Sequence, residues 1–434
     1  MASGPGDVQD GGMGQAGSQP GARRLLAAVA TVCAVLTGVG VLLLWPGDTP
    51  LGALAGVTSS GPTSGAEVSS VEEGSCAGSP DPSAPQCRLV TIELRSGEDA
   101  GGQAVIEFPS GSPVGDLHPG DSIIVARSTI GETVRYSYVD RDRKPALLIL
   151  FVAFAAAVIA LGRFRGLMAL VGLVASGVVI IRFILPAVLL GESPVLVAIV
   201  GSSVIAFLAL YLAHGFGPLT NVALLGTIVS LVVTLVLSEV FAGLADFTGF
   251  SSEEAFLVNL GAGQVDLRGL ILAGVIIGAL GAIDDITVTQ ASTVWELRGA
   301  DPRMPASDLF RSAMRVGRDH VASTVNTLFL AYAGASLPLL LLFVLTGRSL
   351  GSVANGEVIA VEIVRALVGS IGLVASVPIT TALAVMSLGS LDGTVQASGR
   401  APVDPPRQPP QGPPERQWMP ERRRDLWRRR RSRG

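Results

Sequence analysis

Two adjacent aspartates, Asp284 and Asp285, lie within a long apolar run of the sequence. A charged side chain near the centre of a bilayer costs about 2.5–3.5 kcal/mol on insertion scales, so such residues generally have a partner or a function. Two neighbouring carboxylates do not both ionise at low cost in an apolar environment. The pair therefore predicts a site that holds a proton or a cation. The alternative is a pair at the level of the cytoplasmic headgroups, solvated by water.

A strip of bare backbone precedes the two aspartates. It consists of Gly274, Gly278 and Gly281, which share one helical face with Asp285. Residues without side chains allow a neighbouring helix to approach closely. We therefore expect a contact between helices along this face, which continues beyond Asp285 through Thr289.

Polar residues recur in the next two apolar runs. Asp319 precedes the first run and Asn326 lies within it, about 10 Å along a helix that rises 1.5 Å per residue. The second run carries Thr380 two residues after a proline, whose ring frees a backbone carbonyl. The alternatives here are simple hydrogen bonds between helices and a plain proline kink. We expect one ion- or substrate-binding pocket in the cytoplasmic half of the bilayer, formed by Asp284, Asp285, Thr289, Asp319, Asn326 and Thr380.

The composition indicates that these residues lie in a membrane protein. Of 434 residues, 49% are hydrophobic and only 15% are charged, with a mean hydropathy of +0.54, whereas soluble domains carry about 25% charged residues. The sequence has neither a Walker A motif nor a His-Glu-x-x-His motif, and its three histidines are scattered. We therefore expect no enzyme activity, no metal centre and no cofactor.

The apolar runs predict a polytopic all-α bundle of about eight transmembrane helices, since about 20 apolar residues cross a bilayer. A cleaved signal peptide is the alternative for the first run, but no clean small-x-small cleavage site follows Trp45, so we favour an uncleaved helix. The other seven form a transmembrane domain at 146–390. The eight predicted spans are 25–45, 146–162, 166–190, 195–213, 219–243, 267–288, 320–346 and 366–388.

The distribution of arginine predicts the orientation, because short cytoplasmic loops are enriched in Arg and Lys. If the N-terminus is cytoplasmic and successive loops lie on opposite sides of the membrane, the cytoplasmic loops hold Arg163, Arg165 and five arginines between 298 and 318. The external loops hold only Arg268, Arg348 and Arg365. We expect a bacterial plasma-membrane protein with both termini in the cytoplasm. Residues 1–24 and the Pro/Arg-rich tail at 391–434 read as disordered. The tail has eleven Arg and five acidic residues, so it should bind anionic lipids rather than nucleic acid.

The polar stretch at 46–145 predicts a small β-rich module outside the cytoplasm. Apolar and polar residues alternate at 90–95 and at 134–138, and shorter runs at 104–108 and 122–126 read as further strands of a barrel or sandwich. Cys76 and Cys87 both fall in this stretch, so a disulfide between them is one possibility. Cys33 reads as an apolar filler of the first helix.

Several blocks of the chain resemble the YibE/F-like family of bacterial multi-pass membrane proteins. The first is GAIDDITVTQASTVWEL at 281–297, the second is GRDHVASTVNTL at 317–328 with AYAGASLP at 331–338, and the third is SVPITT at 376–381. The likeness covers residues 130 to 390 and includes YVDR at 138–141. This resemblance implies an architecture and no specific activity.

Two functions follow as hypotheses. Carboxylates in the membrane favour a permease for an ion or small solute, with Asp284 and Asp285 as the ionisable groups. A large external module favours instead a membrane scaffold or sensor that transports nothing. The sequence leaves both open.

Overall fold

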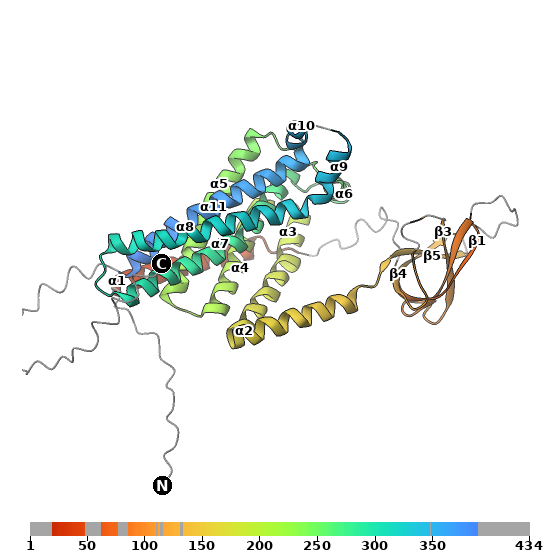
Figure 1. The fold of residues 1–434 in the computed structure, drawn as a ribbon, viewed down its shortest axis with the longest axis horizontal. Helices are drawn as coiled ribbons and strands as arrows, with labels where there is room; N and C mark the ends of the chain where they lie inside the picture. Colours follow the sequence, from red (N-terminus) through yellow and green to blue (C-terminus); the bar gives the residue numbers. More distant parts are fainter. Residues whose placement is uncertain are drawn as a thin grey trace, which may run out of the picture. The chain divides into compact units, whose positions relative to one another are not determined.

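The computed structural model describes residues 20–47, 62–76, 86–109, 112, 116–130, 133–347 and 349–388. The N-terminal segment through residue 19 and the predicted lipid-binding tail at 391–434 lie outside these residues, as does Arg348. The described chain is mostly helical, with one antiparallel sheet that follows the first helix and precedes the others in the sequence (Figure 1).

The helices account for the apolar runs of the sequence. The long ones are α1 Pro20–Leu43, α2 Lys144–Val179, α4 Pro194–His214, α5 Pro218–Leu244, α7 Leu267–Ala300, α8 Ala306–Ala335 and α11 Glu357–Leu388. The shorter ones are the π-helix η3 Ile180–Ile184, α3 Leu185–Leu189, α6 Glu253–Gly261, α9 Leu337–Leu345 and α10 Leu350–Ala354. Six helical segments of the described chain are long and apolar enough to cross a membrane, or seven if the bent pair α8 and α9 is one span.

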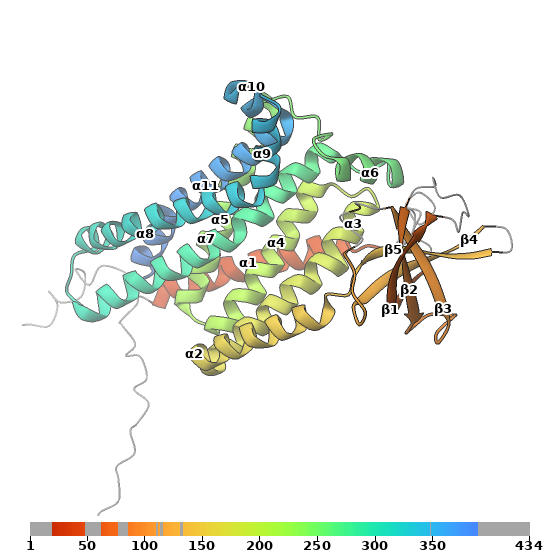
Figure 2. The same cartoon turned by 45° about the vertical axis from the view of Figure 1, so that its right-hand side comes forward.

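One of these six segments changes direction within its length. Lys144–Leu189 is continuous by hydrogen bonding, but Arg163 has the left-handed backbone angle φ 52° with ψ −128°. A Cβ at position 166 would overlap the carbonyl oxygen of Val158, so only glycine fits there. The two arms of α2 diverge from this point (Figures 1 and 2). The sequence predicted a break at 163–165; its count of eight spans stays a prediction.

Three helices are longer than their predicted spans. α7 continues past 288 to Ala300, α11 begins at Glu357 rather than at 366, and α8 begins at Ala306 rather than at 320. The hydropathy of a window marks only the apolar part of a helix. Arg298 holds the turn between α7 and α8, since its Nη1 donates to the carbonyls of Pro302 (3.2 Å) and Met304 (2.7 Å). The predicted span 320–346 is instead two helices bent by 58° at Ser336, next to Pro338.

The helical bundle is built around α7. This helix packs against α4, α5, α8 and α11, and α5 also packs along α11. α1 lies against α4 and α5, and α2 lies against α4. Figure 2 shows α4, α5, α7 and α11 side by side at the centre of the bundle.

The sheet has five strands in the order β3-β2-β1-β4-β5, all pairs antiparallel. They are β1 Thr63–Ser75, β2 Gln86–Leu94, β3 Gln103–Pro109, β4 Ser122–Ile130 and β5 Thr133–Arg141. Phe108 of one edge strand meets Tyr138 of the other, with ring centroids 5.7 Å apart. The sheet is therefore curled, so that its two edge strands β3 and β5 approach each other.

Four of these strands were predicted, β2 and β5 from alternation and β3 and β4 from short apolar runs, and the central one was not. β1 buries only Ser64, Ala66 and Val68 at alternate positions before its register shifts between Val68 and Ser70. Such small residues give little hydropathy signal. Cys76, directly after β1, is joined by a disulfide to Cys87 in β2, with Cα atoms 5.0 Å apart.

Candidate functional site

Hydroxyl groups fill the middle of the helical bundle. Where α5, α7 and α11 meet, the fully or almost fully buried polar side chains are Thr227, Ser230, Thr234, Ser238, Thr287, Gln290, Ser376, Thr380 and Thr381. The outer faces of α5 and α11 expose leucine, valine and isoleucine instead. This arrangement suits a lipid environment, in which buried hydroxyl and amide groups join helices.

Asp284 lies beside this hydroxyl cluster. Its backbone carbonyl accepts a hydrogen bond from Thr287 Oγ1 (2.9 Å), and that hydroxyl lies 2.8 Å from Thr227 Oγ1 of α5. Within the described chain, its carboxylate oxygen Oδ1 is inaccessible to solvent and has no hydrogen-bond partner. A buried carboxylate oxygen without a donor is costly unless a proton or a cation neutralises it. This is one of the two aspartates that the sequence singled out; its side chain is partly buried, with Oδ1 inside the bundle.

The structure separates Asp285, Asp319 and Asn326 from that interior: each is exposed. Adjacent residues on a helix point about 100° apart, so Asp285 turns away from the buried face of α7. α8 turns Ala313 and Gly317 toward the bundle, and Asn326 is nine residues further on, which is about half a turn away. The predicted pocket of six residues is therefore not assembled around Asp284.

Thr380 and Thr289 lie differently from what the sequence predicted. Thr380 of α11 is fully buried, with its hydroxyl against the bare backbone of Gly226 in α5, and it has no hydrogen-bond partner in the described chain. Thr289 is only half-buried. Beside it, Gln290 donates to Thr381 Oγ1 (2.7 Å) and to the carbonyl of Ala313 (3.0 Å), which ties α7 to α11 and α8.

The glycine strip of α7 receives side chains rather than the backbone of a neighbouring helix. A Cβ on Gly278 would lie 2.6 Å from the Tyr332 hydroxyl of α8, and one on Gly274 would lie 3.4 Å from an Arg365 nitrogen of α11. Gly281 has open space beside it. Long side chains of α8 and α11 thus occupy the space beside Gly278 and Gly274, and the predicted close approach of a helix along this face stays a prediction.

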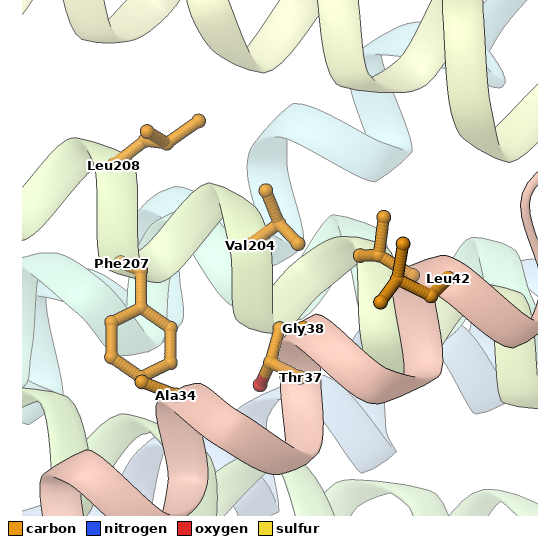
Figure 3. A pocket seen from close by; sticks show the side chains of 8 residues that line it. Ala34, Thr37, Gly38, Leu42, Val204, Phe207 and Leu208 are labelled. Atoms are coloured by element: carbon orange, nitrogen blue, oxygen red, sulfur yellow. The ribbon is translucent and has the colours of Figure 1, made fainter.

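A separate cavity of about 480 Å³ lies between α1 and α4 (Figure 3). Its lining is apolar except for Thr37, and it includes Phe207, Val204 and Leu42. None of the buried hydroxyls or aspartates faces it. The cavity therefore offers no polar group with which to recognise an ion.

The α5 side of the polar cluster was not predicted from the sequence. Thr227 is hydrogen-bonded to α7, and Gly226 receives Thr380, yet the only charged residue of α5, Glu239, lies more than three turns further along the helix. One signal was available: a glycine, a serine and a threonine recur every four residues in both α5 and α11.

The fold defines a class: a largely helical chain with several helices suited to cross a membrane and a small β module. Residues 150–390 match the family described as YibE/F-like protein. The chain therefore belongs to the YibE/F-like family, as its sequence blocks indicated. No curated protein and no solved structure matches it.

Proposed function

We propose that this chain is a membrane permease for a proton or a small monovalent cation, moved alone or with a small solute, and that Asp284 is its ionisable group. The observation that supports the proposal is the carboxylate oxygen of Asp284, buried in an apolar bundle without a donor. A structural role would give that oxygen a partner, because buried polar groups in proteins are nearly always hydrogen-bonded.

The surroundings of Asp284 favour a cation or proton over an anion. The hydroxyls of Thr287 and Thr227 and the backbone carbonyl of Asp284 are hydrogen-bonded within one turn of α7, and hydroxyl, carbonyl and carboxylate oxygens are the ligands that hard cations prefer. Arg365 of α11, which is partly buried beside Gly274 of α7, already pairs with Glu362 at 2.6 Å. An anion would therefore meet a carboxylate without a free positive charge beside it.

We further propose eight crossings of a bacterial plasma membrane, with both termini in the cytoplasm. The reversal at Arg163 makes two crossings of α2 with η3 and α3, and the bent pair α8 and α9 makes one. Arg163 and Arg165 then lie at a cytoplasmic turn, in accord with the positive-inside rule. Labelling of single cysteines near residues 164 and 250 with an impermeant thiol reagent tests this: 250 should react from outside and 164 only after lysis.

The transport proposal is tested by a matched pair of neutral variants in proteoliposomes. Asp284→Asn should reduce proton or cation flux at least tenfold, because the amide cannot exchange a proton or balance a cation. Asp285→Asn is the control: it is adjacent and of the same chemistry but exposed, so its flux should stay within about twofold of the parent. Flux that is equal in all three proteins would contradict a role for Asp284.

The alternative function is a scaffold or sensor, and one observation favours it. The β module is a complete fold with its own apolar core and a disulfide, which transport does not require. If this alternative holds, the parent protein shows no flux above empty liposomes for H⁺, Na⁺ or K⁺. Deletion of the module would then produce the same cellular phenotype as loss of the whole protein, whereas Asp284→Asn cells would behave like the parent.

A further inference from the structure

Helices α5 and α11 carry the same pattern of four residues. Val, Gly, Ser and Thr follow one another at intervals of four, which places them on one face of a helix. In α5 they are Val222, Gly226, Ser230 and Thr234, and in α11 they are Val368, Gly372, Ser376 and Thr380. All eight are buried.

The two faces pack against each other reciprocally. The Thr380 hydroxyl of α11 fills the space above Gly226 of α5, and the Thr234 hydroxyl of α5 fills the space above Gly372 of α11; a Cβ on either glycine would overlap it. Since the residue numbers run in opposite order across the contact, the helices are antiparallel. Figures 1 and 2 both show α5 and α11 side by side. The midpoint of this register pairs Ser230 with Ser376.

Each of these helices is the second member of a hairpin that flanks α7. α4 precedes α5, and α8 with α9 precedes α11; all four long helices pack against α7. Because α5 and α11 run in opposite directions, the hairpins α4–α5 and α8–α11 have opposite orientations. A half-turn about an axis between Ser230 and Ser376 therefore exchanges the pattern of one hairpin with that of the other.

We propose that α4–α5 and α8–α11 are inverted halves of a transporter, and that the contact between the two patterned faces is the pivot on which they rock. This inference rests on the proposed permease function. Inverted halves around a central site allow one arrangement to face either side of the membrane by exchanging the conformations of the two halves. α7, with Asp284, lies between the halves and supplies that site.

The halves differ in the hydrogen bonds along this contact. Ser230 donates to the carbonyl of Gly226 (2.7 Å), whereas Ser376 donates to that of Leu373 (2.7 Å), and α11 alone has a proline, Pro378, within the pattern. Thr234 donates its hydroxyl to the carbonyl of Ser230 (2.9 Å), whereas Thr380, at the equivalent place, has no partner in the described chain. In the opposite state we expect the exchange of these roles, with Thr380 bonded to Ser376 and Thr234 free. Each state thus satisfies one of the two threonines.

The exchange is tested without any transported solute, by labelling buried cysteines at the two ends of the contact. Each residue of the α5 pattern has its counterpart in α11 146 positions later, so Thr220 of α5 corresponds to Ala366 of α11. Both side chains are at most 5% exposed. Thr220→Cys and Ala366→Cys are made singly in a Cys33→Ala chain, and their rates of reaction with N-ethylmaleimide are compared.

Thr234→Val and Thr380→Val should change the ratio of these two rates in opposite directions, by about threefold, as the average hydrogen bond in a membrane bundle allows. Thr220→Cys and Ala366→Cys alone give the reference ratio. A static contact of small residues predicts an unchanged ratio, and a general loosening predicts the same direction in both variants. Either result overturns the pivot.

A second experiment locks the proposed axis. Ser230→Cys with Ser376→Cys should form a disulfide on mild oxidation, whereas Val236→Cys, which is exposed on α5, should not pair with Ser376→Cys. Because the half-turn exchanges these two residues, their separation is the same in both states, so the cross-link should form and leave flux within about twofold of the parent. Absence of the cross-link, or a tenfold loss of flux that a reductant restores, contradicts the pivot. A parent without flux contradicts only the permease proposal, and the labelling ratio then decides the exchange.

Discussion

The β module and the helical bundle place polar and apolar residues in opposite ways. In the module, Val90, Ile92 and Ile123 are completely buried, and the charged side chains form ion pairs on the surface, such as Arg95 with Glu67 at 2.8 Å. In the bundle, threonines and serines are completely buried between α5, α7 and α11, and leucines are exposed. The module therefore has an apolar interior and a charged surface, whereas the bundle has buried hydroxyls and an apolar surface. The difference follows from the surroundings, water for the module and lipid for the bundle.

This difference predicts which substitutions should destabilise each region. Water drives the module to bury apolar area, at about 25 cal/mol per Å². Lipid offers no such gain between helices, so the bundle depends on close packing and on hydrogen bonds that are individually worth about 0.6 kcal/mol. Removing buried methyl groups should lower the stability of the module, and removing buried hydroxyls should lower the stability of the bundle by a smaller amount.

The largest effect is expected in the core of the module. Ile92→Ala removes a side chain that is 0% exposed, so it should destabilise the module by about 2–5 kcal/mol through lost burial and a cavity. Hydrogen exchange of β1 and β2 in the full-length protein measures the loss. Val105→Ala is the control, since this side chain in β3 is 55% exposed; equal losses would show that the module has no apolar core of this kind.

The disulfide of the module is expected to contribute somewhat less. It closes a loop with a sequence separation of 11 between Cys76 and Cys87, for which chain entropy predicts about 3 kcal/mol. The double variant Cys76→Ser/Cys87→Ser should increase hydrogen exchange in β1 and β2 while α5 and α11 stay protected. Exchange that rises equally in the helices would mean that the two regions do not unfold independently.

The buried hydroxyl pair of the bundle should give a smaller effect. Thr287→Val leaves Thr227 without its partner at 2.8 Å and should lower stability in detergent by about 1 kcal/mol. Thr227→Val/Thr287→Val removes both hydroxyls and should recover most of the loss, since no polar group is then left unpaired. A double variant that is less stable than the single one would refute this account of the bundle.

The smallest effect concerns pH and the exposed side of the module. The Tyr136 hydroxyl and then the Arg127 guanidinium hydrogen-bond the carboxylate of Asp99 and hold its pKa below the ordinary 3.8. A lowered pKa in the fold means stability that is fully present above pH 3.8 and is lost as the pH falls through the lower, folded value. Protection of β4 and β5 should thus fall in acid, and Asp99→Asn should flatten that part of the dependence. An unchanged pH profile would remove the role of this carboxylate.

Parts of this fold follow from the sequence because they depend on local patterns. Apolar length predicts helices, alternation and short apolar runs predict strands β2 to β5, and the polar gap between two apolar runs predicts the break at 163–165. The spacing of GAIDDITVTQ and the later blocks indicated the family. The central strand β1 and the polar extensions of α7 and α8 escaped, because their residues carry little hydropathy signal.

The site itself required the tertiary structure. The sequence placed six polar residues at similar depth in three helices, and depth depends only on residue number. Which way a side chain points depends on helix rotation, and rotation is fixed by packing against neighbours: Thr287 against Thr227, Gly226 against Thr380, Gly372 against Thr234. These contacts turn Asp284 inward and leave Asp285 and Asn326 exposed. The sequence by itself determined which helices carry the polar groups, and only the packing of those helices decided which groups share the interior.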